Sequence, residues 1–166
     1  MTRSFRMLVL AVLALATLSA FAQTDAQKAF DAIKNLPGTW EQKSPSGEVL
    51  QVTYKVTSGG SAVMSEIMAP NKEDMISMFH MDGPDKLMLT HYCAAGNQPR
   101  MKATVSPDGK TITFNFLDAT NLSAADAGRM QSMTLTLIDD NHHTEQWVFA
   151  DHGKEMKEFF DLRRKL

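Results

Sequence analysis

The 166-residue sequence has only one cysteine, Cys93, so a disulfide within the chain is excluded. It also lacks an excess of basic residues, because 17 Lys and Arg stand against 19 Asp and Glu. That balance argues against a nucleic-acid-binding surface. A phosphate-binding loop, a dinucleotide fingerprint, a nucleophile elbow and a His-Glu-x-x-His motif are all missing. The sequence therefore offers no familiar catalytic signature.

Long hydrophobic runs are absent except at the start of the chain. Arg3 and Arg6 precede an apolar run over 7–18, and the small residues of Ala20-Phe21-Ala22 follow. This order predicts a secretory signal peptide over 1–22, cleaved after Ala22. The run is shorter than the ~20 residues that a membrane-spanning helix needs. We expect a mature protein that begins at Gln23, has no membrane anchor and is periplasmic or secreted.

The next segment, 23–37, is a predicted lead-in to the main domain. The apolar residues Ala26, Ala29, Phe30 and Ile33 follow helical spacing, and Pro37-Gly38 ends the pattern. The spacing predicts one short helix over 25–36.

From Gly38 onward the apolar residues recur at every second position, which is typical of half-buried strands. Turn sequences such as Pro107-Asp108-Gly109 separate the runs. The predicted strands cover 38–43, 48–58, 62–68, 74–81, 86–93, 100–106, 111–117, 130–138, 143–150 and 155–163, with a helical turn at 123–127. An up-and-down meander hides its edges most simply by closing. We predict an all-β domain over 38–166, an antiparallel barrel of about eight to ten strands, with a sandwich as the alternative.

The short helix followed by Gly38-x-Trp40 on the first strand resembles the opening of the lipocalins and the wider calycin superfamily. The layout also resembles small exported bacterial calycin-like proteins of unassigned activity. The resemblance implies that Trp40 packs across a closed barrel base, beneath Arg163 or Arg164 from the last strand. It also implies that the barrel encloses a small, largely apolar molecule.

Barrels of this size are either filled by side chains or hold one small ligand. Ten methionines follow position 22, and this adaptable residue suits an irregular core or a permissive pocket. Methionine, cysteine and histidine also suit copper(I). The scattered methionines and the absence of a Met-x-Met motif favour core packing instead, and no metal or cofactor is predicted.

The stretch from Leu89 to Met101 contains a candidate polar site. Alternation places Leu87, Leu89, His91 and Cys93 on an inward row that ends near the barrel rim. The following turn adds Asn97 and Arg100 to the same rim. Cys93 is either a nucleophile activated by a neighbouring base or, as its residue type favours, a small buried hydrophobe.

Glu145 shares a strand face with His143, Trp147 and Phe149. If the aromatic residues point inward, Glu145 is a buried carboxylate that needs partners; a bulge would turn it outward instead. His142 and His143 follow Asp139-Asp140, and we expect them in a solvated turn.

The pattern predicts a binding protein for a small hydrophobic or amphipathic molecule, whose oligomeric state the sequence leaves open. The predicted polar contacts are His91, Asn97, Arg100 and Glu145, and the predicted apolar lining is Tyr54, Phe79, Phe114, Trp147 and Phe149. One alternative is a barrel enzyme that uses His91 and Glu145, or Cys93. Another is a filled barrel with a structural or interaction role.

Overall fold

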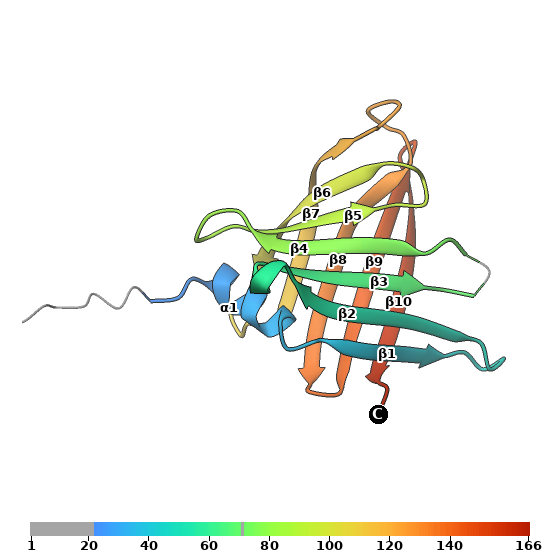
Figure 1. Ribbon diagram of the computed structural model, residues 1–166. Coiled ribbons are helices and arrows are strands. Elements are labelled where there is room, and N and C mark those ends of the chain that lie inside the picture. The colour runs from blue at the N-terminus through green and yellow to red at the C-terminus, as the bar shows by residue number, and fades with distance from the viewer. Residues whose placement is uncertain (1–21, 71) are drawn as a thin grey trace, which may run out of the picture.

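A computed structural model describes residues 22–70 and 72–166 (Figure 1). The predicted signal peptide covers 1–22, and its residues 1–21 lie outside the described residues. Within the described part, no helix is long and apolar enough to cross a membrane. The elements are α1 (Asp25–Ile33), β1 (Gly38–Lys43), β2 (Val49–Thr57), η1 (Ser58–Gly60), β3 (Ala62–Met68), β4 (Met75–Met81), β5 (Leu87–Tyr92), β6 (Gln98–Val105), β7 (Thr111–Thr120), β8 (Arg129–Asp139), β9 (His142–Asp151) and β10 (Lys154–Arg164).

The ten strands form one closed antiparallel barrel in which each strand pairs with its neighbours in sequence, and β10 returns to β1. The predicted all-β up-and-down barrel is confirmed, and the sandwich is not formed. β1 and β3 begin and end where the alternation placed them. The predicted helical turn at 123–127 is wrong: only a turn with Ala127 N–H bonded to Ala124 O forms there.

Helix α1 closes one end of the barrel. Thr24 accepts a hydrogen bond from Gln27 N–H, and the Gln27 side chain accepts one from Thr24 N–H, which caps the first turn. Its buried face consists of Ala29, Phe30 and Ile33. The helix packs against β4, β5 and β6 at the left of Figure 1. Thr24 also donates to Pro84 O, which ties the helix start to the β4–β5 connection.

The barrel is filled at the end that α1 covers. Trp40, Phe79 and Phe114 are fully buried, and the Phe79 ring lies 5.4 Å from that of Phe114 and 6.3 Å from that of Tyr54. Burial of each large apolar side chain stabilises the fold by about 1.5–3 kcal/mol. Truncation of Phe114 to alanine would cost about 3–5 kcal/mol, because the rigid wall around it collapses only in part.

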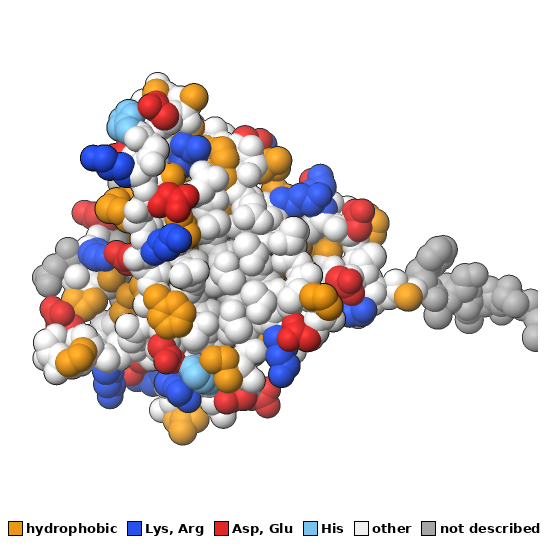
Figure 2. All heavy atoms as spheres, turned by 180° about the vertical axis from the view of Figure 1, so that it is seen from behind, with side chains coloured by type: hydrophobic (Ala, Val, Ile, Leu, Met, Phe, Trp, Pro, Cys, Tyr) orange, Lys and Arg blue, Asp and Glu red, His pale blue; other side chains and the backbone are white. Residues whose placement is uncertain are grey.

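The outer face of β7, β8 and β9 presents mainly uncharged polar side chains. Thr113, Thr134 and Gln146 lie side by side across these strands, and the two threonine hydroxyls are hydrogen bonded. Figure 2, viewed from behind, shows a pale central area with acidic and basic side chains around it. The residues that alternate with these outward side chains point into the barrel.

The other end of the barrel is its mouth. The β1–β2, β3–β4, β5–β6, β7–β8 and β9–β10 connections lie there, because successive antiparallel strands turn at alternate ends. The strand pairing between β1 and β10 is short, with Trp40 opposite Arg164 and Glu41 opposite Arg163 as its register pairs. Strand β10 is therefore held mainly by β9, with which it pairs from Lys154 to Arg163.

Candidate functional site

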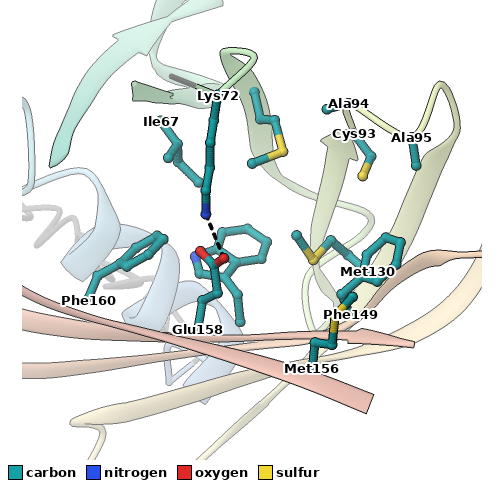
Figure 3. A pocket seen from close by; sticks show the side chains of 12 residues that line it. Ile67, Lys72, Cys93, Ala94, Ala95, Met130, Phe149, Met156, Glu158 and Phe160 are labelled. Atoms are coloured by element: carbon teal, nitrogen blue, oxygen red, sulfur yellow. Dashed lines mark hydrogen bonds and ion pairs between the residues drawn. The ribbon is translucent and has the colours of Figure 1, made fainter. Parts of the chain in front are cut away.

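A pocket of about 290 Å³ opens at the mouth (Figure 3). We call it the mouth pocket; it is lined by Ile67, Lys72, Met75, Cys93, Ala94, Ala95, Met130, Trp147, Phe149, Met156, Glu158 and Phe160. These residues come from the mouth ends of β3, β4, β8 and β10, from β9, and from the β3–β4 and β5–β6 connections. The wall is predominantly apolar, which suits a small organic molecule.

Three of the ten methionines after position 22, Met75, Met130 and Met156, meet in this pocket although they belong to different strands. Their flexible thioether chains let the wall adapt to different ligand shapes. Sequence reasoning missed all three as site residues. The sequence feature that could have pointed to this wall is the spacing of Met156, Glu158 and Phe160 at every second position of the last strand.

One ion pair lies beside the mouth pocket. Lys72 Nζ is 2.7 Å from Glu158 Oε1, and both side chains are 54% exposed. The dashed line in Figure 3 shows that it joins the β3–β4 connection to β10. An exposed pair contributes at most about 1 kcal/mol, so a ligand can displace it at little cost.

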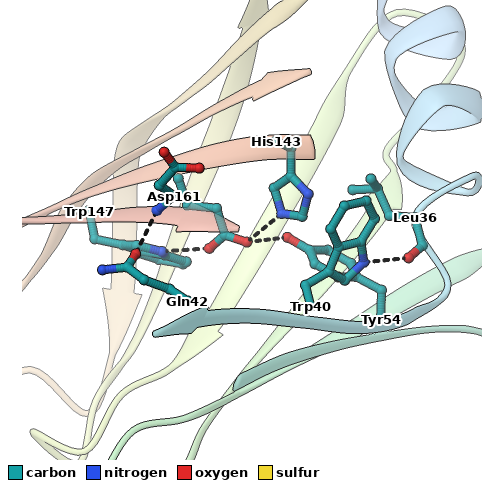
Figure 4. A network of polar contacts seen from close by, with 8 residues as sticks. Leu36, Trp40, Gln42, Tyr54, His143, Trp147 and Asp161 are labelled. Carbon is teal, nitrogen blue, oxygen red and sulfur yellow. Dashed lines mark hydrogen bonds and ion pairs between the residues drawn. The ribbon is translucent and has the colours of Figure 1, made fainter. Parts of the chain in front are cut away.

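Beneath the pocket, Glu145 is fully buried and is surrounded by hydrogen-bond donors. Figure 4 labels the surrounding residues Tyr54, His143 and Trp147, whose dashed lines meet at the Glu145 carboxylate. Tyr54 Oη donates to its Oε1, and Trp147 Nε1 donates to its Oε2 over 2.8 Å. His143 Nε2 lies 3.3 Å from Oε1. A buried carboxylate without such partners would cost several kcal/mol. Burial and the charge of Glu145 raise the pKa of Tyr54 well above its ordinary value, so the phenol keeps its proton and remains a donor.

His91 is the second buried polar group. Its Nδ1 is hydrogen bonded to Ser77 Oγ over 2.9 Å, and its ring lies 4.9 Å from that of Trp147. Its Nε2 has no hydrogen-bond partner among the residues that the structure describes. Burial lowers the pKa of His91 to about 4, against the opposing effect of Glu145. The imidazole is therefore neutral at neutral pH.

The barrel base contains the arrangement expected from the Gly38-x-Trp40 resemblance. Trp40 is fully buried, and its Nε1 donates to Leu36 O over 2.9 Å. The Arg164 guanidinium lies 4.2 Å from the Trp40 ring centroid and donates to Pro37 O. Gly38 has φ of +127°, and a Cβ there would lie 3.0 Å from Arg164 Nη1. The glycine thus permits both the backbone turn and the close approach of Arg164.

The predicted apolar lining divides between two regions. Trp147 and Phe149 line the mouth pocket. Tyr54, Phe79 and Phe114 instead pack in the core and do not line the mouth pocket. Sequence alternation identified all five as inward residues but could not distinguish solid core from open pocket.

The four predicted polar contacts do not meet in the mouth pocket. His91 and Glu145 lie in the buried interior, with Trp147 in contact with both. Asn97 is buried at the rim and donates to Gly128 O over 2.8 Å, which supports the β7–β8 connection. Arg100 is exposed on the outer surface and forms an ion pair with Asp118.

The expectation of a solvated turn at His142 and His143 is wrong. Both residues begin β9, and the His143 side chain is fully buried with its ring 4.2 Å from that of Trp40. The preceding acidic residues favoured a turn, whereas β9 begins at His142, one residue before the predicted strand 143–150. On β3, Ser65 and Ile67 are buried, so Glu66 between them faces outward.

Cys93 lies in the wall of the mouth pocket and is partly buried. Burial raises the pKa of its thiol, which is the opposite of the shift that activates a nucleophilic cysteine. In the described residues, no three His, Cys, Asp or Glu side chains gather in a group that could hold a metal ion.

No protein-family model matches this chain, and no curated protein matches it. Nine chains of solved structures match it. One is the crystal structure of Rv2717c from M. tuberculosis, with a TM-score of 0.55 and 16% sequence identity, covering 83% of this chain and 98% of that one. At this identity the similarity concerns the barrel fold alone.

Proposed function

We propose that this protein binds one small, predominantly apolar or amphipathic molecule in the mouth pocket. The observation that carries the proposal is the contrast between the two ends of the barrel. Phe79, Phe114 and their neighbours fill the barrel interior under α1, and a cleft at that end is lined in part by charged residues such as Lys110. The mouth end instead has a predominantly apolar pocket of about 290 Å³. A wall of methionine and aromatic side chains beside open volume is the usual composition of a small-molecule site.

The size and polarity of the pocket restrict the ligand. Its volume lies at the lower limit of the range of about 300–1,000 Å³ that is common for ligand sites, so a compact molecule fits best. Lys72 and Glu158 are the charged residues of the lining, and their pair is half exposed. The apolar part of the ligand would contact Met130 and Phe149, and a polar end would remain beside that ion pair.

The proposal includes a calycin-like identity and export, with secretion or periplasmic location after cleavage near Ala22. Support for the first is the packing of Arg164 on Trp40 at the barrel base. Support for the second is the basic, apolar and small-residue order over 1–22.

The enzyme alternatives have less support. Glu145 and His91 are both fully buried, and neither lines the mouth pocket, so a substrate there would not reach them without rearrangement. Cys93 does line the pocket, but burial raises the pKa of its thiol. These features favour binding over acid–base or nucleophilic catalysis.

Native mass spectrometry of the purified protein, followed by solvent extraction, tests the proposal directly. We expect an organic adduct of one molecule per chain. Titration with anilinonaphthalene sulfonate supplies a second readout, because Trp147 in the pocket wall reports a nearby bound molecule. Phe149→Ala is expected to weaken binding of this probe about tenfold through lost apolar contact, equivalent to about 1.4 kcal/mol.

Leu117→Ala is the matched control, since Leu117 is a large apolar residue that is 53% exposed and lies outside the pocket lining. It should leave probe affinity unchanged. A bare protein mass together with equal probe binding by both variants would refute the mouth pocket as the binding site.

A further inference from the structure

The mouth half of β10 has a free edge. Among residues 22–70 and 72–166, β9 pairs with β10 from Lys154 to Arg163, whereas β1 pairs only with Arg163 and Arg164. Every residue from His152 to Phe159 is exposed. Barrel closure therefore leaves part of one strand with backbone groups available for pairing.

Two hydrogen bonds identify which backbone groups point to this edge. On the β1 side, Asp161 N–H donates to the Gln42 side chain and Lys165 N–H donates to Thr39 O. Backbone groups alternate between the two sides of a strand, so odd-numbered residues of β10 face away from β9. Glu155, Lys157 and Phe159 thus present their N–H and C=O groups at the free edge.

We propose that the free edge of β10 pairs with the same edge of a second copy of this chain. The two segments Lys154–Glu158 would run antiparallel about a twofold axis through Met156. A symmetric dimer of this kind uses one surface twice, so the surface must be complementary to itself.

The charge pattern of this segment meets that requirement. In the proposed register, Lys154 lies opposite Glu158 of the second copy, and Glu155 lies opposite Lys157 of the second copy. Both opposed pairs are attractive, and the same pairs repeat across the axis. The backbone groups agree with the register, because Glu155 and Lys157 are among the residues whose hydrogen-bonding groups point outward.

The two neighbouring positions of the twofold axis, at Lys157 and at Glu155, give unfavourable registers. A shift of the axis to Lys157 places that lysine opposite itself. A shift to Glu155 opposes two glutamates, and like charges directly opposite each other are destabilising. Lysine on a free edge usually discourages pairing with arbitrary strands. Here the alternating signs select this same segment as the partner.

The proposed axis also pairs an exposed apolar side chain with itself. Met156 is 59% exposed and forms part of the mouth-pocket wall. Pairing would cover Met156 and bring the mouth pockets of the two copies to opposite sides of the axis. The dimer does not depend on ligand binding, so its test is independent of the proposed function.

Sedimentation velocity over a concentration series, at low and high salt, tests the dimer. We expect wild type to dimerise with increasing concentration, and Glu155→Lys or Lys157→Glu alone to shift association at least tenfold toward monomer. The double variant Glu155→Lys, Lys157→Glu restores opposite charges and should restore the dimer. Wild type that stays monomeric, or single variants that dimerise as well as wild type, would overturn the proposal.

A cross-link fixes the register. In a Cys93→Ser background, Met156→Cys places one thiol at the axis from each copy, and we expect a disulfide dimer under mild oxidation. Phe159→Cys is the matched control, since Phe159 is 57% exposed on the same strand but lies three residues from the axis. Equal cross-linking by both variants, or preferential cross-linking of Phe159→Cys, would contradict this register.

Discussion

The buried imidazole of His91 makes the barrel sensitive to acid. Burial lowers the pKa of His91 from 6.5 to about 4, so the unfolded chain binds this proton more tightly than the folded chain does. The free energy of unfolding therefore falls as the pH decreases between these two values. The stabilisation from neutral His91 is fully present above pH 6.5, and its loss is complete below about pH 4.

The size of the effect follows from the pKa difference. Each pKa unit corresponds to 1.36 kcal/mol, so the shift from 6.5 to about 4 corresponds to about 3 kcal/mol. His91→Gln removes the titration and retains an amide that can reach Ser77 Oγ. Urea unfolding followed by circular dichroism should show that wild type loses about 3 kcal/mol more than this variant between pH 7 and pH 4.

His152 supplies the control because its shift has the opposite sign. The hydrogen bond to Asp126 raises the pKa of the exposed His152, so its contribution is present at low pH and is lost as the pH rises through its folded-state pKa. His152→Gln should therefore retain the acid-induced loss. Equal losses in wild type and His91→Gln would refute the assignment of acid sensitivity to His91.

Three further predictions concern the base, the buried cluster and the pocket wall. Tyr54→Phe removes a donor to buried Glu145, and urea unfolding should show a loss of about 1–3 kcal/mol. Arg164→Leu removes the contact with Trp40 and the bond to Pro37 O, so its melting temperature should fall several degrees, whereas Arg163→Leu on the exposed side should change it little. Burial raises the pKa of the Cys93 thiol, so Cys93 in the native protein should react with a thiol reagent more slowly than free cysteine at the same pH. On unfolding it should react at the rate of free cysteine. Fast labelling of the native protein would contradict this prediction.

The barrel itself was predictable from local patterns. Apolar alternation and turn residues placed the ten strands, and each strand pairs with its sequence neighbours, so no long-range choice of topology was needed. The helix prediction rested equally on local spacing. The error at 123–127 arose because a run of small residues resembles a helical turn, while the connection between β7 and β8 forms other turns.

The site was less predictable because its contacts join distant residues. Glu145 was equally compatible with an inward and an outward position, and Tyr54, 91 positions away, provides one of the donors that accommodate it inside. Arg100 was predicted as a polar contact at the rim, whereas the structure exposes it on the outer surface, where it pairs with Asp118. The predicted polar contacts therefore do not meet in the mouth pocket.

The sequence by itself determined the periodicity, the turns and therefore the order of strands around the barrel, because each depends on residues within about a dozen positions. Only the tertiary structure decided that Phe79 and Phe114 pack in the barrel interior and that an apolar pocket opens at the mouth. It also decided that Lys72 meets Glu158 and that the mouth half of β10 keeps a free edge. Those features depend on how strand lengths and side-chain volumes match across the closed barrel, which no local pattern specifies.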